Sequence, residues 1–364
     1  MTAVRIQYLN RLILLATAPF LGIAVWMVWT SWLTTAGAAA DPGLSSGVDI
    51  EAASAASTEA AAAVSDGLDK AEALAAQTTK TIEKSAQIYR LANADMNTMV
   101  RRAANYASKP LRIYDRRITG KIGTPSKQVQ SNKLTAQLFY VKAQNFTGYA
   151  MKVKLKSDNA MRMVLGYDKV GKAETTLSAA RRYKAVAGVN AGGYADDGGK
   201  RYPLSTTVLG GRYIGGFQPS YKDLFFVGMN KDMKLIGGKY KSRDQLDKQE
   251  PKFGASFVPV LMKDGRRQPI PPKWQKTPYR APRTVIANYR DDQLLFIVTD
   301  GYNENGRSGA TLKEMQMLLE RFGVKDAYNL DGGGSSSLIF NGRVVNKPSD
   351  GRLRGLATHF LFFK

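Results

Sequence analysis

The spacing of apolar residues divides this chain of 364 residues into three parts. Residues 12–33 are an apolar run without a charged residue, long enough for a helix to cross a bilayer core of about 30 Å. Residues 34–113 are rich in Ala, Ser, Thr, Glu and Lys, and residues 114–364 contain the short apolar or alternating runs that are typical of strands. The pattern predicts a membrane segment, a helical stalk and a strand-rich domain, in that order.

The N-terminal apolar run has the flanks of a membrane anchor. Arg5 and Arg11 precede it, and three tryptophans lie near its distal end, where interfacial aromatic residues are common. We therefore expect residues 1–11 to be cytoplasmic and the C-terminal domain of a single-pass cell-membrane protein to be extracytoplasmic. Cleavage near Ala40, which would give a secreted protein, is the alternative. The run is longer than the usual signal core of about 7–15 residues, which favours the uncleaved anchor.

Residues 34–113 have the composition of a long, solvated helix. Two rows of apolar residues repeat every seven positions: Ile82, Tyr89 and Met96 in one, and Ala92, Met99 and Tyr106 in the other. Heptad spacing is typical of coiled coils, but Ala and Ser fill such an interface poorly. A solvated stalk is therefore favoured, and self-association through it is the alternative. Lys109-Pro110 is the expected end, since the residue before a proline avoids the helical region.

The C-terminal half contains a strand–helix–strand pattern. A buried strand ends at Asp300, and a helix begins at Thr311, where Thr311 and Glu314 form a capping box. Gly323 ends this helix, and the next strand ends at Asp331. We expect the two strands to be parallel neighbours. That arrangement would bring Asp300 and Asp331 together at the sheet edge where α/β proteins bind ligands.

Other segments of the outer domain also predict strands. Residues 134–141 and 149–156 alternate or form short buried runs, and residues 185–190 form a strand that leads into a glycine pair. A helix is expected at residues 175–183. The fold class is therefore α/β or α+β, with a strand-rich domain of more than two hundred residues, enough for a substantial core.

The segment from Tyr328 to Ser337 carries the strongest chemical signal. An apolar strand ends in Asp331, continues through three glycines and leaves through three serines. Glycine lets the backbone approach a ligand closely, and successive N–H groups in such a turn bind anions. The segment therefore indicates a pocket that holds a phosphate or an anionic sugar beside a carboxylate. A tight Gly-Ser turn between strands is the alternative interpretation.

This segment and four others, in matching order and spacing, resemble the phosphodiester glycosidase family, which has lysosomal members and bacterial members related to exopolysaccharide. The matching stretches are 189–194, 283–287, 299–301, 308–314 and 329–336. Ala195 follows Tyr194 where the family usually has an aromatic pair, and Tyr302 follows Gly301 where an arginine is common. The resemblance implies hydrolysis of sugar-1-phosphodiesters at the glycosidic C–O bond.

Residues of these stretches are the candidates for the active site. Asp331 and Asp300 are the expected catalytic carboxylates, and Glu314 is a third candidate whose capping-box role is the alternative. Arg283 and Arg307 would hold the phosphate through bidentate guanidinium groups. The remaining candidates, which would bind substrate in the same pocket, are Asn190, Gly192, Gly193, Ser308, Asn329, Gly332, Gly333, Gly334, Ser335 and Ser336.

Composition narrows the chemistry. The chain has no cysteine, which excludes a thiol nucleophile and a cysteine zinc site. Its one histidine, His359, lies in an apolar C-terminal strand, where we expect a structural role. Carboxylates are therefore the expected acid/base groups. The sequence requires no cofactor, and a Ca²⁺ or Mg²⁺ ion between Asp300 and Asp331 is an open alternative.

The charge of the chain indicates an anionic partner. Fifty-three Lys and Arg residues against 30 Asp and Glu give a formal net charge of +23. Such a field attracts polyanions. For an exported protein we expect a sugar phosphate or an anionic cell-envelope glycopolymer, including exopolysaccharide, rather than nucleic acid. A non-catalytic protein that binds the cell wall and a transferase of exopolysaccharide assembly are the alternatives to a hydrolase.

Overall fold

The structure is a computed structural model that describes residues 50–301 and 309–364. The chain divides into two units, Met1–Thr98 and Met99–Lys364. Residues 1–11 and the anchor expected at 12–33 lie outside the described residues. Among the helices of the described part, none has the length and apolar character needed to cross a membrane.

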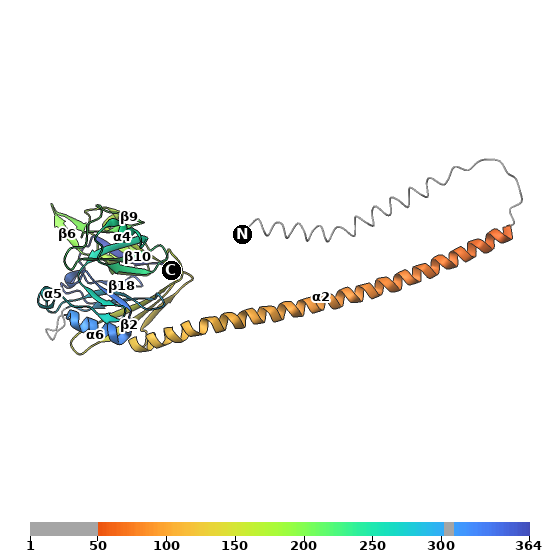
Figure 1. Cartoon of the computed structure of the whole chain (residues 1–364), viewed down its shortest axis with the longest axis horizontal. Helices are drawn as coiled ribbons and strands as arrows, with labels where there is room; N and C mark the ends of the chain where they lie inside the picture. Colours follow the sequence, from red (N-terminus) through yellow and green to blue (C-terminus); the bar gives the residue numbers. More distant parts are fainter. Residues whose placement is uncertain (1–49, 302–308) are drawn as a thin grey trace, which may run out of the picture. The chain divides into compact units, whose positions relative to one another are not determined.

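The stalk is one helix, α2 (Ile50–Ile122), of 73 residues (Figure 1). Its side chains between residues 54 and 107 are exposed, as expected for a solvated stalk. The expected end at Lys109-Pro110 is wrong, because Pro110 lies inside the helix. The last turns are held by the domain: Ile118 is buried, and the Nζ of Lys152 lies 2.6 Å from Asp115 Oδ1. The helix therefore continues through Pro110 to these packed turns, whose tertiary contacts the local sequence does not predict.

The strands of the outer domain form three large sheets and one hairpin, and their pairings are antiparallel throughout the described part. The eight-stranded sheet has the order β1 (Lys127–Gln130), β2 (Leu134–Lys142), β3 (Thr147–Leu155), β16 (Leu294–Thr299), β15 (Thr284–Asn288), β17 (Asp326–Leu330), β13 (Val260–Lys263), β14 (Arg266–Arg267). One five-stranded sheet has the order β11 (Leu235–Gly238), β10 (Phe225–Asn230), β12 (Pro251–Phe257), β8 (Val208–Leu209), β9 (Arg212–Tyr213). The other has the order β19 (Arg343–Val344), β18 (Leu338–Phe340), β5 (Ala187–Asn190), β20 (Thr358–Phe362), β4 (Met161–Leu165). The hairpin pairs β6 (Tyr194–Asp197) with β7 (Lys200–Pro203).

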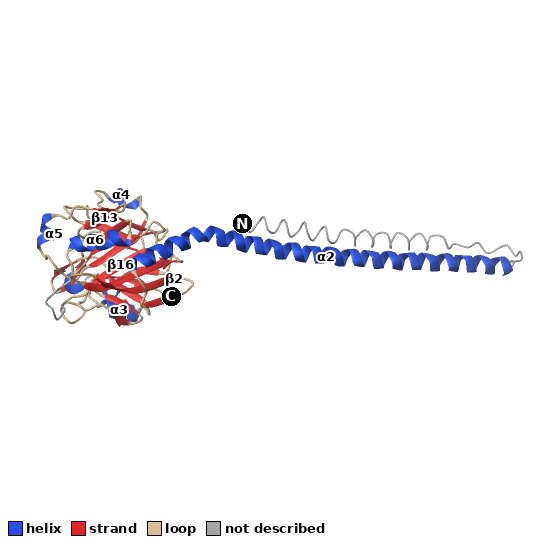
Figure 2. Ribbon diagram, turned by 90° about the horizontal axis from the view of Figure 1, so that it is seen from below, coloured by secondary structure: helices blue, strands red, loops and turns tan. Residues whose placement is uncertain are grey.

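Short helices lie around these strands (Figure 2). They are α3 (Thr176–Arg182), α4 (Arg243–Asp247), α5 (Pro272–Lys276), α6 (Leu312–Phe322) and the 3-10 turns η1 (Gly166–Asp168) and η2 (Gly333–Ser335). Helix α3 confirms the helix expected at 175–183, with Thr175 as its N-cap. The predominance of antiparallel strands makes the domain α+β rather than α/β.

Both faces of the eight-stranded sheet are covered. One face packs against the two five-stranded sheets, with Phe296 of β16 meeting Phe360 and Phe362 of β20. The other face packs against α6 and the last turns of α2, through Ile297 and Met315 among others. This double burial explains why β16 reads as a continuous apolar run in the sequence.

The two strands and the helix predicted between residues 294 and 331 are present, but the prediction that the two strands are adjacent in the sheet is wrong. The capping box of Thr311 and Glu314 begins α6, and Gly323 ends it with a left-handed φ of 74°. However, β15 lies between β16 and β17 and runs antiparallel to both. The two strands therefore run in the same direction without pairing. Asp300 and Asp331 share a sheet edge, but two inter-strand spacings of about 4.8 Å each separate their strands.

Candidate active site

Asp331 lies where the ends of two sheets meet. It follows β17 of the eight-stranded sheet, and its backbone N–H donates to the carbonyl of Ala191, 3.2 Å away, just beyond β5 of the neighbouring sheet. The Nδ2 of Asn190 donates to the carbonyl of Asp331 at 2.5 Å. The structure thus brings Asn190 and Asp331 together, although they are far apart in the sequence.

The side chain of Asn190 holds this junction through both its amide nitrogen and its amide oxygen. Its Oδ1 accepts a hydrogen bond from Thr284 Oγ1 and another from the backbone N–H of Ser337, both at 3.0 Å. Asn190 is wholly buried. It therefore positions the serine segment against β15, rather than offering its amide to a ligand.

The glycines of the motif provide room for their neighbours. A Cβ on Gly334 would collide with the guanidinium of Arg354, and one on Gly332 would lie 2.9 Å from the carbonyl oxygen of Pro282. The N–H of Gly333, which has a left-handed φ of 59°, donates to that same carbonyl at 2.7 Å. The anion cradle expected from the backbone N–H groups is therefore already occupied at Gly333, and the turn acts mainly by allowing close approach.

Several polar atoms of the motif are shielded from solvent and lack a hydrogen-bond partner among the described residues. They are Asn329 Oδ1, Asp331 Oδ2, Ser335 Oγ and Ser336 Oγ. An unpaired polar group in such a position costs about 1–3 kcal/mol. Four of them within eight consecutive residues mark the place where a polar ligand would supply the missing partners.

The electrostatics of Asp331 suit acid/base chemistry. Burial raises the pKa of its carboxyl group from 3.8 to about 6. The hydroxyl of Ser335, which lies nearby without reaching hydrogen-bonding geometry, the charge of Arg354, the N–H of Gly332 and the charge of Arg201 lower that pKa and oppose the effect of burial only in part. A pKa near the working pH lets a carboxylate accept and return a proton readily.

Two arginines that the sequence motifs did not indicate, Arg354 and Arg201, lie close enough to Asp331 for their charges to lower its pKa. Arg354 donates from Nη2 to Asp350 Oδ2 at 2.9 Å and from Nη1 to the hydroxyl of Tyr194 at 3.5 Å. Arg201 stacks on the ring of Tyr194, 3.9 Å from its centroid, and donates from Nε to Asp196 at 2.7 Å. Arg201 follows the 189–194 stretch closely in the sequence, and Arg354 lies in none of the five matching stretches.

Asp300 has a structural explanation for both of its carboxylate oxygens. Oδ2 accepts from Thr147 Oγ1 at 2.7 Å, and Oδ1 accepts from the backbone N–H of Lys347 at 2.8 Å. The side chain is buried. Asp300 therefore joins β3 to the segment that follows β19, and the expected pairing of Asp300 with Asp331 as two catalytic carboxylates finds no support in these contacts.

Glu314 is used in the same way. Its Oε2 accepts from the backbone N–H of Thr311 at 2.8 Å, which completes the capping box. Its Oε1 accepts from Asn145 Nδ2 at 2.8 Å and from Arg280 at 3.1 Å. These contacts explain Glu314 as the residue that begins α6, which was the alternative to a catalytic role.

Of the two arginines expected to hold the phosphate, the structure describes Arg283, and its side chain is used in structural contacts. Arg283 is buried, and it donates from Nε to the carbonyl of Ala310 at 3.0 Å and from Nη2 to the carbonyl of Pro278 at 2.8 Å. Burial lowers the pKa of Arg283 to about 10. Arg283 thus holds two loop segments together. Arg307 and Ser308 lie outside the described residues.

The glycine pair after β5 is a packing feature. A Cβ on Gly192 would collide with Ala255, and one on Gly193 would lie 2.8 Å from the ring of Phe257. The N–H of Gly193 donates to the carbonyl of Ser256 at 3.0 Å. Both glycines therefore allow β5 to approach β12 closely, and this explains them without a ligand.

Two further expectations concern His359 and a metal ion. His359 is wholly buried in β20, and burial lowers its pKa to about 4, so it is neutral and structural, as expected. Its Nδ1 lies 3.1 Å from Thr176 Oγ1, which lies 2.7 Å from Ser337 Oγ. No group of three or more His, Asp and Glu side chains suited to a metal occurs within residues 50–301 and 309–364.

The family comparison agrees with the site. Residues 183–363 match the sequence profile of the phosphodiester glycosidase family. This range contains Asn190, Arg201, Asp331 and Arg354.

Two curated proteins illustrate the sequence similarity. The chain is 30% identical over 181 residues to the SPbeta prophage-derived uncharacterized protein YomE of Bacillus subtilis (strain 168), covering 49% of this chain and 28% of that protein. It is 29% identical over 164 residues to N-acetylglucosamine-1-phosphodiester alpha-N-acetylglucosaminidase of Bos taurus, covering 40% of this chain and 30% of that protein. The matched region thus spans less than a third of either relative.

A solved structure shows the same fold. The catalytic domain of zebrafish N-acetylglucosamine-1-phosphodiester alpha-N-acetylglucosaminidase, auto-inhibited by its pro-peptide, superposes with a TM-score of 0.53. The alignment covers 66% of this chain and 86% of that one at 20% identity. At this identity the likeness concerns the fold of the strand-rich domain.

Proposed function

Because residues 183–363 belong to the phosphodiester glycosidase family, we propose that this protein hydrolyses sugar-1-phosphodiesters at the glycosidic C–O bond. The observation that carries this proposal is the group of unpaired polar atoms around Asp331, Ser335 and Ser336, beside two arginines. A sugar phosphate would supply hydroxyls and anionic oxygens to these atoms. The name of the bovine relative describes the same class of linkage.

Asp331 is the general base in this mechanism. Its ionised carboxylate takes a proton from a water molecule whose oxygen attacks the anomeric carbon. The C–O bond to phosphate breaks, and the phosphate monoester leaves with the bonding electrons, while the sugar keeps the new hydroxyl. Phosphate is a good leaving group, so the demanding tasks are to orient the water and to stabilise charge. The hydroxyls of Ser335 and Ser336 are placed to donate to substrate oxygens.

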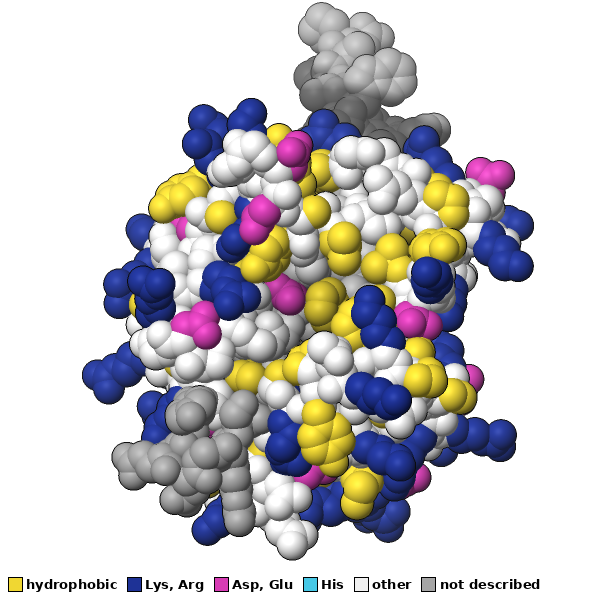
Figure 3. Space-filling view, turned by 90° about the vertical axis from the view of Figure 1, so that its left-hand side faces the viewer, with side chains coloured by type: hydrophobic (Ala, Val, Ile, Leu, Met, Phe, Trp, Pro, Cys, Tyr) yellow, Lys and Arg dark blue, Asp and Glu magenta, His cyan; other side chains and the backbone are white. Residues whose placement is uncertain are grey.

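The natural substrate in this proposal is an anionic glycopolymer of the cell envelope, or exopolysaccharide. Lys and Arg side chains are spread over much of the face in Figure 3, with fewer acidic ones among them. The net charge of +23 would attract such a polymer to the domain. An anchor at residues 12–33 would hold the domain outside the cell, next to that polymer.

The test is to incubate the full chain, in detergent, with N-acetyl-α-glucosamine 1-(methyl phosphate) and with analogues that differ in sugar and anomer. We expect free reducing sugar and methyl phosphate in equal amounts. Retention of these compounds without turnover would replace the hydrolase by a sugar-phosphate-binding protein. Product formed only with an added sugar acceptor would replace it by a transferase.

A further inference from the structure

We propose that Arg201 and Arg354 together form the clamp that selects a phosphodiester over a neutral glycoside. This inference rests on the proposed function and assigns the phosphate-binding part of that site. The two residues come from separate segments, the β6–β7 hairpin and the loop before β20. Both lie close enough to Asp331 for their charges to act on its carboxyl group.

Tyr194 joins the two arginines into one unit. Its ring stacks against the guanidinium of Arg201, and its hydroxyl accepts from Nη1 of Arg354. Nη1 of Arg201 also donates to the carbonyl of Gly355, the residue next to Arg354. The hairpin and the loop are thus connected twice, through an aromatic ring and through the backbone, which fixes the spacing of the two cations.

Two carboxylates orient the guanidinium groups and leave donors for a ligand. Asp196 receives Nε and Nη2 of Arg201, and Asp350 receives Nη2 of Arg354. Guanidinium has five N–H donors. Contacts to described residues use three of them on Arg201 and two on Arg354, which leaves two and three. Two oriented forks suit the two non-bridging oxygens of a phosphodiester, with bidentate geometry that an ammonium group lacks.

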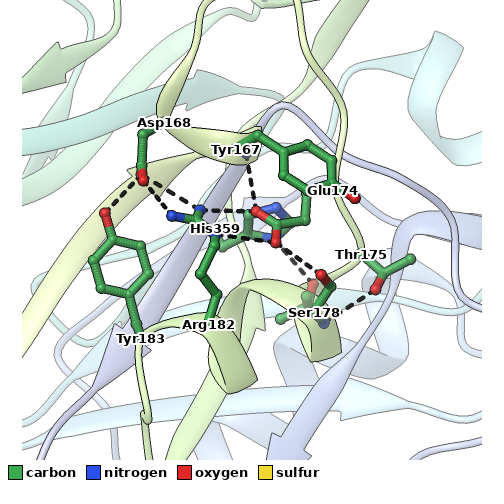
Figure 4. Close-up of polar contacts among 9 residues, drawn as sticks. Tyr167, Asp168, Glu174, Thr175, Ser178, Arg182, Tyr183 and His359 are labelled. Atoms are coloured by element: carbon green, nitrogen blue, oxygen red, sulfur yellow. Dashed lines mark hydrogen bonds and ion pairs between the residues drawn. The ribbon is translucent and has the colours of Figure 1, made fainter.

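A polar cluster around the buried carboxylate of Glu174 (Figure 4) fixes a segment that contacts the backbone near both arginines. The carboxylate of Glu174 accepts from the backbone N–H of Tyr167 at 2.9 Å, from Ser178 Oγ at 2.8 Å and from Arg182 Nη2 at 2.8 Å. Arg182 also pairs with Asp168. These contacts fix the segment 166–174, in which Tyr167 and Asp168 have left-handed φ values of 50° and 58°.

The segment 166–174 forms backbone hydrogen bonds with the strand that carries Arg201 and with the loop that carries Arg354. The carbonyl of Gly171 accepts from the N–H of Arg201 at 3.1 Å. Glu174 and Leu356 exchange two backbone hydrogen bonds, of 3.1 and 2.7 Å, two residues beyond Arg354. The Glu174 cluster is therefore a positioning device for the clamp, and it does not itself contact the proposed ligand.

The experiment compares two substrates with the same sugar and anomer: N-acetyl-α-glucosamine 1-(methyl phosphate) and the neutral p-nitrophenyl N-acetyl-α-glucosaminide. For Arg201→Lys and Arg354→Lys we expect kcat/KM on the phosphodiester to fall by about 10²-fold, as for loss of a charge-stabilising donor. Activity on the neutral glycoside should change by less than about threefold. Arg267→Lys is the matched control, because Arg267 also pairs with a carboxylate, Glu320, on another part of the domain.

Binding of inorganic phosphate, measured by calorimetry, gives a readout that does not need turnover. We expect each Lys variant to weaken it at least about tenfold, with an unfolding temperature close to wild type. Lys variants that cleave the phosphodiester as well as wild type would overturn the clamp and leave the proposed function standing. Equal losses on both substrates would also overturn it. Phosphate binding that depends on Arg201 and Arg354, in a protein that cleaves neither substrate, would support the clamp and overturn the proposed hydrolysis.

Discussion

Apolar side chains of the stalk remain in contact with solvent, whereas those of the strand-rich domain are removed from it. Tyr89 and Met96 in α2 are 70% and 62% exposed. Phe296 and Tyr328 in the eight-stranded sheet are 0% and 1% exposed. Both regions contain regular secondary structure, but only the domain is stabilised by the burial of its apolar side chains.

The difference shows that local interactions determine the stalk, whereas long-range interactions determine the domain. The stalk is rich in alanine, the residue with the highest helix propensity, and its ion pair Lys70–Asp66 joins positions one turn apart. Its structure follows from neighbours in the sequence. The domain depends on pairings between segments that are distant in the sequence. Its candidate active site combines four such segments, which contain Asn190, Arg201, Asp331 and Arg354.

The largest expected effect is the loss of activity in Asp331→Asn. The change keeps the shape of the side chain but removes its ability to accept a proton, so we expect kcat to fall by about 10²–10⁴-fold. Turnover of the sugar-1-phosphodiester measures it, with circular dichroism to check the fold. Asp66→Asn in the stalk is the control and should keep full activity. Turnover by a folded Asp331→Asn protein at the wild-type rate would remove Asp331 from the mechanism.

The second prediction compares the two regions directly by stability. Phe296→Ala should lower the free energy of unfolding of the domain by about 3–5 kcal/mol, because it leaves a cavity between the sheets. Tyr89→Ala should change it by less than about 0.5 kcal/mol, since its side chain is exposed. Urea unfolding of both variants provides the measurement. A large loss in Tyr89→Ala would mean that the stalk residues are buried against a second copy, as in a coiled coil.

A smaller effect is expected from the pKa of Asp331 on stability. Between about pH 4 and pH 6 the unfolded chain loses this proton while the folded protein, with its pKa raised to about 6, keeps it. Wild-type stability should therefore fall as the pH rises through this window, and Asp331→Asn should escape that loss. Above pH 6 the variant should be the more stable one. The pKa change limits this loss in the free energy of unfolding to about 3 kcal/mol, and the partial exposure of Asp331 reduces the expected loss to about 1–2 kcal/mol.

Urea unfolding of the wild type and of Asp331→Asn at about pH 4 and pH 7 checks the direction of this stability difference. The difference between them should be near zero at the lower pH and favour Asp331→Asn at the higher one. A variant that is less stable than wild type at pH 7 would show that the carboxylate stabilises the fold, contrary to its burial without a full set of partners. Asp66→Asn should give no difference at either pH.

The smallest expected effect is that of removing residues 1–98. The remaining unit, Met99–Lys364, contains the whole core and the candidate site, so kcat/KM on a small sugar-1-phosphodiester should stay within about twofold of the full chain. Sedimentation of residues 50–364 tests the other property of the stalk, and we expect a monomer. A stable dimer that disappears with residues 50–98 would favour the coiled coil over the solvated stalk.

The sequence by itself determined most of the elements and indicated Asp331 as the centre of the candidate site. The capping box of Thr311 and Glu314, the left-handed Gly323 and the apolar run of β16 each report on hydrogen bonds or burial within one segment. The Gly-Ser motif is also a single short segment, and it indicated a ligand site at Asp331 without information from distant residues. The structural role of His359 followed from its apolar surroundings in one strand.

Only the tertiary structure decided which residues meet. The insertion of β15 between β16 and β17 separated Asp300 from Asp331, and the hydrogen bonds of Arg283 to the carbonyls of Ala310 and Pro278 gave its side chain a structural role. Arg201 and Arg354 are 153 positions apart, and their approach depends on Tyr194 and on the segment fixed by Glu174. Local patterns record the preferences of neighbouring residues, whereas these contacts arise from the packing of whole sheets, which no short stretch of sequence specifies.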